Sequence, residues 1–245
     1  MEAVIALFKR SFETLKRFPQ LFVFPALCWI VGLVFQSVLG GFMLRAMLRG
    51  SGFSLATIGI ASVSGIIVQL VVQLVAAYFS AGQVRGLLLA AEGAALTPAL
   101  FGEACKKYGN RVLMAKLLRV GLLLGVGIIG GLLALLLPGL GTLLALLAAG
   151  AVALLTVFWE MVIVRDGAEV QPALATSYEL VTRNLVLVCL PLIAIGIGQS
   201  IITAVVGSLP ALSSLITQVL VAPFAGLVAV DLLQQIKTGQ TTIAS

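Results

Sequence analysis

The sequence has no histidine and very few charged residues. Charged side chains make up 10% of its 245 residues and hydrophobic ones 61%, whereas soluble domains carry about 25% charged and about 45–50% apolar residues. A water-soluble fold cannot cover its surface with so few charges, so the excess apolar surface must face lipid. The absence of histidine excludes most metal sites and most general-base chemistry.

Cysteine is also scarce, and the motifs of membrane enzymes are missing. Cys28, Cys105 and Cys189 are too few and too scattered for a disulfide framework, and free cysteines usually fill small spaces in a core. The sequence contains no HExxH motif, no serine–histidine pair and no phosphate-binding glycine loop. Asp231 has no second embedded aspartate with which to form a catalytic dyad. We therefore expect no enzyme, no cofactor and no metal site.

Long apolar runs are present instead, and each is long enough for the roughly 20 residues with which a helix crosses a bilayer. They cover residues 21–44, 55–79, 112–137, 141–164, 185–206 and 212–233. Continuous apolarity rich in glycine and alanine favours helices over barrel strands. The first run is too long for the core of a signal peptide, so it is expected to be retained as a helix.

Short breaker-rich segments at 49–52, 138–141 and 207–210 join these runs in pairs, which predicts tight helical hairpins. A polar segment with helical periodicity precedes each pair. The first, around Phe12, has an aromatic face and a basic face, as in helices that lie at the level of lipid headgroups. The second starts at Thr97-Pro98, an expected N-cap followed by proline at the first helical position.

The amphipathic segments repeat in sequence. Residues 11–17 (SFETLKR) align without gaps with 177–183 (SYELVTR), and the same register pairs Pro25 with Pro191. The predicted fold class is therefore an all-α integral membrane protein, with six transmembrane helices in a single membrane domain over residues 1–245. It is built from three repeats of an amphipathic interfacial helix plus a helical hairpin, at about 1–96, 97–169 and 170–245.

Each unit also carries a glutamate four residues before a base, which places the pair on one helical face in the favourable order. These pairs are Glu13/Arg17, Glu103/Lys107 and Glu179/Arg183. Two interpretations stay open. The pairs are either solvated support for the helix, worth about 0.3–0.5 kcal/mol each, or they help to hold the interfacial helix against the bundle.

The basic residues indicate orientation. With the N-terminus inside, only Arg45 and Arg49 fall in the outer turns, and the other 13 of the 15 bases lie on the inner side. The positive-inside rule then places both termini in the cytoplasm, in a cell (plasma or inner) membrane. Because these bases flank the apolar runs, the net charge of +6 indicates anionic lipid headgroups as partners and no nucleic acid.

Few polar residues lie within the apolar runs. The candidates are Gln36, Gln69, Gln73, Glu160, Gln199, Thr203 and Gln218. Gln69 and Gln73 are one turn apart and are expected to point into the bundle, where they either form interhelical hydrogen bonds or line a polar cavity. Glu160 is the one acid well inside a run, so it either couples a proton or ion to transport, or reaches headgroup water or pairs with a base.

Three stretches together resemble a known family. They are residues 11–27 (SFETLKRFPQLFVFPAL), 78–107 and 158–184 (FWEMVIVRDGAEVQPALATSYELVTRN). They resemble a poorly characterised group of prokaryotic six-helix membrane proteins, which is similar to the membrane domain attached to some glycerophosphodiester phosphodiesterases. The resemblance covers nearly the whole chain and implies the six-helix fold. It implies no substrate, because the sequence shows no soluble phosphodiesterase segment.

Two hypotheses for function remain open. The first is a non-enzymatic transport or permease-like component, whose short cytoplasmic helices couple to a separate ATPase or another membrane subunit. The second is a lipid-interacting membrane scaffold or assembly factor, which the basic amphipathic segments favour. Either can form a homo-oligomer.

Overall fold

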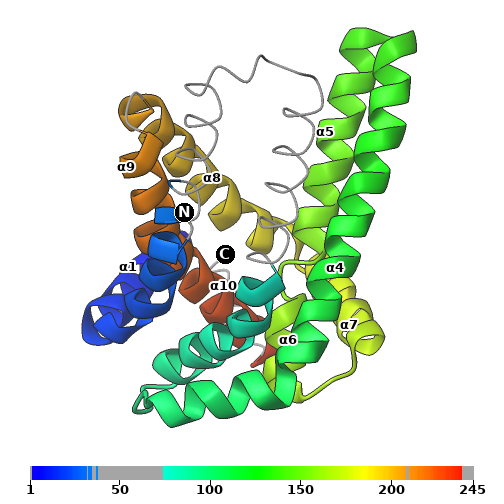
Figure 1. Cartoon of the computed structure of the whole chain (residues 1–245). Coiled ribbons are helices and arrows are strands. Elements are labelled where there is room, and N and C mark those ends of the chain that lie inside the picture. Colours follow the sequence, from blue (N-terminus) through cyan, green and yellow to red (C-terminus); the bar gives the residue numbers. More distant parts are fainter. Residues whose placement is uncertain (1, 32, 35–36, 38–73, 208–209, 239–245) are drawn as a thin grey trace, which may run out of the picture.

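The computed structural model describes residues 2–31, 33–34, 37, 74–207 and 210–238 (Figure 1). Within these ranges the chain forms helices and no strands. The elements are α1 (Glu2–Arg17), the 3-10 helix η1 (Pro19–Phe22), α4 (Pro98–Leu136), α5 (Pro138–Leu155), α6 (Trp159–Asp166), α7 (Val170–Arg183), α8 (Leu185–Val206), α9 (Pro210–Leu215), the π-helix η2 (Ile216–Val221) and α10 (Ala222–Lys237). Two further helices are named by their residues, Pro19–Val31, which includes η1, and Leu74–Ala91.

Several of these helices have the length and apolarity of membrane spans. Among the described residues there are five: Leu74–Ala91, Pro98–Leu136, Gly139–Asp166, Leu185–Val206 and Leu212–Lys237. Pro19–Val31 is apolar but shorter. The last four predicted runs each coincide with one of these spans. Residues 38–44 of the first run and 55–73 of the second, together with Gln36, lie outside the described residues, so Gln69 and Gln73 do as well.

The turn at Pro138 produces the expected hairpin of α4 and α5, which lie side by side in Figure 1. Proline lacks an N–H and fits the first position of α5, so α4 ends just before it. Small residues let the two helices touch, because a Cβ built on Gly130 would overlap the Cβ of Ala145.

Other glycines of α4 do not take part in this contact. No described atom lies within 4 Å of a Cβ built on Gly121, Gly125, Gly127 or Gly131. The contact uses Gly130 because that residue is on the side of α4 that faces α5. Spacing alone does not show which side of an all-apolar helix meets its neighbour.

Two apolar runs contain local irregularities where the sequence predicted regular helices. Between α5 and α6 the hydroxyl of Thr156 donates to the carbonyl of Val152 at 2.8 Å, a local bond that bends helices, and α6 restarts at the buried Trp159. In the last run the π-helix η2 precedes Pro223. Proline has no N–H to donate to the preceding turn, and a π turn accommodates the lost bond.

The amphipathic segments take two forms. The first and third are separate helices, α1 and α7, whereas the second is the start of the 39-residue α4. Thr97 is its N-cap as expected, since its Oγ1 accepts from the backbone N–H of Leu100 at 3.4 Å and Pro98 follows. In Figure 1 the start of α4 lies along the bottom, and the rest rises beside α5.

The tightly packed core occupies the lower half of the molecule as drawn in Figure 1. There α1, Leu74–Ala91, the start of α4, α6, α7 and α10 bury a common set of side chains, with Phe158 and Trp159 among the largest. The α4–α5 hairpin extends beyond this core with strongly exposed leucines, such as Leu135 at 80%. Such apolar exposure suits lipid rather than water.

Candidate functional site

The helices α1 and α7 share one pattern of burial at matched positions. Ser11 and Ser177 are each completely buried. One turn later Leu15 and Val181 are buried, at 6% and 0% exposure. Both helices therefore face the core with the residues at the same two positions of their shared sequence motif.

The next position of each motif is an exposed aromatic residue. Phe12 is 51% exposed and Tyr178 is 54% exposed. A base accompanies the first of these rings, since the ammonium of Lys16 lies 4.6 Å from the ring centroid of Phe12. An exposed aromatic ring beside a base is typical of the membrane–water interface.

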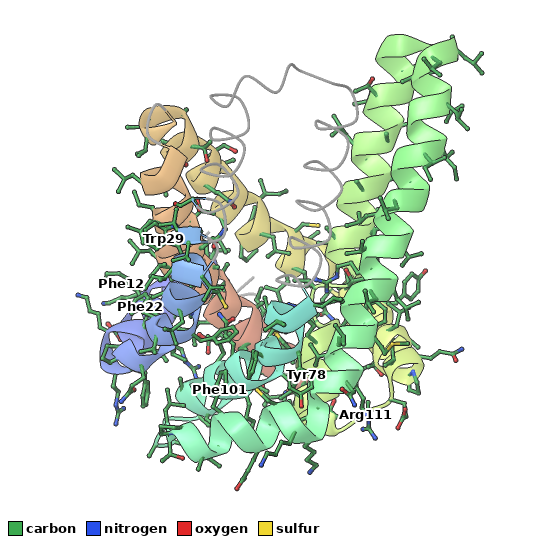
Figure 2. All side chains as sticks on the ribbon, in the orientation of Figure 1. Phe12, Phe22, Trp29, Tyr78, Phe101 and Arg111 are labelled. Carbon is green, nitrogen blue, oxygen red and sulfur yellow. The ribbon has the colours of Figure 1, made fainter. Side chains whose placement is uncertain are left out.

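We call the exposed bases and aromatics of α1, the start of α4 and α7 the basic-aromatic set. It consists of Lys9, Arg10, Phe12, Lys16, Arg17, Lys106, Lys107, Tyr178 and Arg183. The three segments that carry it all lie in the lower half of the molecule in Figure 1. In Figure 2, Phe12 lies at the left of that half, and basic side chains project from its lower edge.

The three expected glutamate–base pairs differ in the structure. Glu179 and Arg183 are 2.6 Å apart. Arg17 and Lys107 instead lie 5.7 Å and 5.1 Å from the ring centroids of their neighbours Phe18 and Tyr108. Within the described residues neither Glu13 nor Glu103 has a base within 4 Å. In the part of the chain that the structure describes, Arg17 and Lys107 therefore form no ion pair with an acid of their own helix.

Glu160 lies at the centre of a partly buried charge cluster, with 14% of its side chain exposed. Its two carboxylate oxygens lie 3.4 Å from the ammonium of Lys116 and 3.3 Å from the guanidinium of Arg119, both on α4. The hydroxyl of Ser80 donates to it at 3.5 Å, and Arg119 also donates to the carbonyl of Thr156. The cluster joins α4, α6 and Leu74–Ala91.

The sequence left pairing with a base open for Glu160 but named no partner, and the structure places Lys116 and Arg119 beside it. In the described part of the chain Arg165 does not pair with it, and its Nη1 is buried without a hydrogen bond there. Lys116 and Arg119 lie three residues apart inside the third apolar run, so they share a helical face. Two bases inside an apolar run are the sequence feature from which these partners of Glu160 could have been predicted.

A second buried carboxylate, Asp231 of α10, is 1% exposed. The hydroxyl of Ser11 donates to its Oδ2 at 2.7 Å, and the guanidinium Nε of Arg10 lies 3.7 Å from its Oδ1. Oδ1 itself accepts no hydrogen bond from any described residue. In the sequence, Asp231 stands out as an acid within an apolar stretch. In the structure its contacts with Ser11 and Arg10 connect α10 to α1.

Further polar bonds fix the loop between α6 and α7. Gly167 ends α6 in the left-handed conformation at φ +67°, which glycine adopts most easily. The guanidinium of Arg111 donates to the Gly167 carbonyl at 2.6 Å and pairs with Glu169 at 2.8 Å. Trp159 Nε1 donates to the carbonyl of Val170 at 2.7 Å. Lys237, at the end of α10, pairs with Asp166.

The remaining candidates do not join these clusters. Gln199 and Gln218 lie on α8 and η2, and both are exposed. The structure therefore does not place them on an enclosed polar path. The cysteines are unpaired, and Cys105 donates its thiol to the carbonyl of Phe79 at 3.8 Å. Within the described ranges no group of three or more Cys, Asp or Glu is placed to hold a metal ion.

Comparison with known protein families, curated proteins and solved structures finds no match for this chain.

Proposed function

We propose that this chain is a non-enzymatic, multi-pass membrane protein that binds anionic lipids of the cytoplasmic leaflet through its basic-aromatic set. The observation that carries the proposal is the matched exposure of α1 and α7. Each helix buries a serine and an aliphatic residue and exposes an aromatic ring and an arginine. The two helices thus repeat one pattern of buried and exposed residues at the same end of the molecule, and this pattern suits a membrane interface.

Electrostatics indicates that these exposed bases and aromatic rings bind anionic lipid headgroups. A base near an anionic membrane surface gains about 1 kcal/mol, and aromatic rings favour the headgroup region. Arg17 and Lys107 have no acidic partner within 4 Å in the described part of the chain, so their charge is free to attract lipid phosphates. The membrane is then the cell (plasma or inner) membrane, with both chain ends on the cytoplasmic side, as the positive-inside rule requires.

The orientation has a direct test. In a variant without native cysteines, Lys107→Cys is labelled in right-side-out vesicles with a thiol reagent that cannot cross membranes. We expect labelling only after the vesicles are opened. Labelling of intact vesicles would place the basic-aromatic set outside and refute the proposal.

Lipid preference is measured on the delipidated full-length protein in bilayers with spin-labelled phosphatidylglycerol or phosphatidylcholine. At low salt we expect the protein to immobilise several-fold more phosphatidylglycerol than phosphatidylcholine. Salt of about 1 M should remove most of this preference, because the Debye length falls to about 3 Å. Equal association with both lipids at low salt would refute the proposal.

Matched variants separate the basic-aromatic set from the rest of the surface. Lys16→Gln combined with Arg17→Gln and Arg183→Gln should lower the phosphatidylglycerol preference. Glu13→Gln combined with Glu179→Gln changes the same helices with the opposite sign, so it should leave the preference equal or higher. A fall of equal size in both variants would indicate altered folding of α1 and α7 rather than lost attraction.

A transport component is the second candidate, and the Glu160 cluster is the observation that favours it. Three charged side chains lie inside two candidate spans, and charged residues within membranes often serve ion or substrate movement. In that case gently solubilised protein should retain a partner such as a separate ATPase in native mass spectrometry. Protein that carries only lipid, alone or as a homo-oligomer, would count against transport.

A further inference from the structure

A pocket of about 350 Å³ lies between Pro19–Val31, Leu74–Ala91 and the start of α4. Its walls are mainly aliphatic and aromatic, and they include Leu21, Phe24, Leu27, Leu89, Leu100 and Phe101. This volume is at the lower end of the range for ligand pockets, about 300–1,000 Å³. It has room for part of a flexible apolar chain.

Glycines on one helix let side chains of the other two walls approach its backbone. Gly82 and Gly86 are one turn apart and both line the pocket. The ring of Phe101 lies over Gly82, where a Cβ would come within 2.6 Å of it. Phe101 also packs on Phe24, with the ring centroids 5.3 Å apart. The pocket wall is therefore a fixed aromatic surface that rests on the helix backbone.

Arg85 is the one charged residue among those that line the pocket. It lies on the same helix as the two glycines, and no acid in the described part of the chain is within ion-pair distance of it. The N-terminus of α4, at Thr97 and Pro98, also borders the pocket, and the positive end of its dipole adds to the charge of Arg85. An apolar pocket with an unneutralised cation calls for a ligand with an apolar chain and an anionic group.

We propose that this pocket binds an acyl chain of an anionic phospholipid whose phosphate pairs with Arg85. The inference deepens the proposed function and rests on it, because it assigns one lipid of the surrounding leaflet to a defined site. The pocket lies between helices of which Leu74–Ala91 and α4 are candidate membrane spans. Bilayer lipid is the ligand with the required chemistry that such helices meet at the highest concentration.

The test uses full-length protein in bilayers with phosphatidylglycerol or phosphatidylcholine that carries a diazirine on one acyl chain. After irradiation, crosslinked residues are mapped by mass spectrometry. We expect crosslinks in residues 20–27 and 96–101, with about a fivefold preference for phosphatidylglycerol. Arg85→Gln should remove the preference and Arg85→Lys should keep it. Lys237→Gln, which changes a base at the end of α10 outside both the pocket and the basic-aromatic set, should leave it intact.

A second variant tests the chain rather than the headgroup. Leu100→Trp adds volume to a residue that lines the pocket, so it should lower crosslinking of both lipids in residues 20–27. The inference is overturned if crosslinks avoid these segments, or if Arg85→Gln leaves the headgroup preference unchanged. If either result is found while the protein still shows a salt-sensitive preference for phosphatidylglycerol in the bilayer, only the assignment of this pocket is wrong. If that general preference is also absent, the proposed function fails with it.

Discussion

Ser11 of α1 donates a hydrogen bond of 2.7 Å to Asp231 of α10, 220 positions later in the chain, and both side chains are buried. Among the side-chain hydrogen bonds in the described part of the chain, this bond joins the two residues that lie farthest apart in the sequence. It connects the first amphipathic helix to the last candidate span, and it adds a polar contact to the apolar packing of α1 on α10, such as that of Phe8 on Phe224.

Removal of the donor should destabilise the protein. Ser11→Ala leaves Asp231 Oδ2 without its bond, and Oδ1 already has none, so we expect a loss of about 1.5–3 kcal/mol. The free energy of unfolding is measured by titration with a denaturing detergent. Ser200→Ala is the matched control, because that hydroxyl is exposed and bonds only within its own helix. Addition of Asp231→Leu to Ser11→Ala should recover much of the loss, and a double variant weaker than Ser11→Ala would contradict this account.

Local features of the fold were predictable from the sequence. The proline at 138 marks the end of one helix and the start of the next. The N-cap at Thr97 depends only on residues of the same helical turn. The breaks at Thr156 and before Pro223 were missed, because hydropathy does not register a hydroxyl that bonds to its own helix or a π turn. Periodicity correctly located the amphipathic α1 and α7.

The partners in the buried clusters could not be predicted in the same way. Glu160 was identified as an embedded acid, yet its bond to Arg119 spans 41 positions and depends on how the α4–α5 hairpin folds. Arg165 is nearer in sequence but does not pair with it. Asp231 was considered only as half of a catalytic dyad, and its partner lies at the opposite end of the chain. Sequence spacing constrains neighbours on one helix and says little about contacts between helices.

The Glu160 cluster gives a second prediction. Glu160→Gln leaves Lys116 and Arg119 as two close positive charges without a counter-ion, so we expect a loss of about 1–3 kcal/mol, reduced by the partial exposure of both bases. Glu179→Gln removes one partner of an exposed pair and should change stability by less than about 1 kcal/mol. Detergent-induced unfolding of both variants checks this, and equal stability of the two would show that the cluster is not structural.

The α4–α5 hairpin gives a third prediction, based on adjacent glycines. Gly130→Ala places a methyl group against Ala145, at a distance that the two helices cannot keep, so we expect a loss of about 1–3 kcal/mol. Gly131→Ala adds the same group where no described atom lies within 4 Å. Because alanine favours helix by about 1 kcal/mol over glycine, this control should be neutral or stabilising. Similar losses in both variants would argue against the contact with Ala145 as the cause and for a general need for glycine in this helix.

The final prediction compares the two matched serines. Ser11 and Ser177 are equally buried and occupy the same motif position, but Ser177 donates to a backbone carbonyl, that of Leu155, at 2.8 Å. A neutral carbonyl that loses its donor costs about 0.5–1.5 kcal/mol, and a carboxylate about 1.5–3 kcal/mol. Ser11→Ala should therefore destabilise the protein more than Ser177→Ala, measured side by side in the same detergent titration. The reverse order would mean that Asp231 is neutral in the folded protein, because a protonated carboxyl group depends less on the Ser11 hydroxyl.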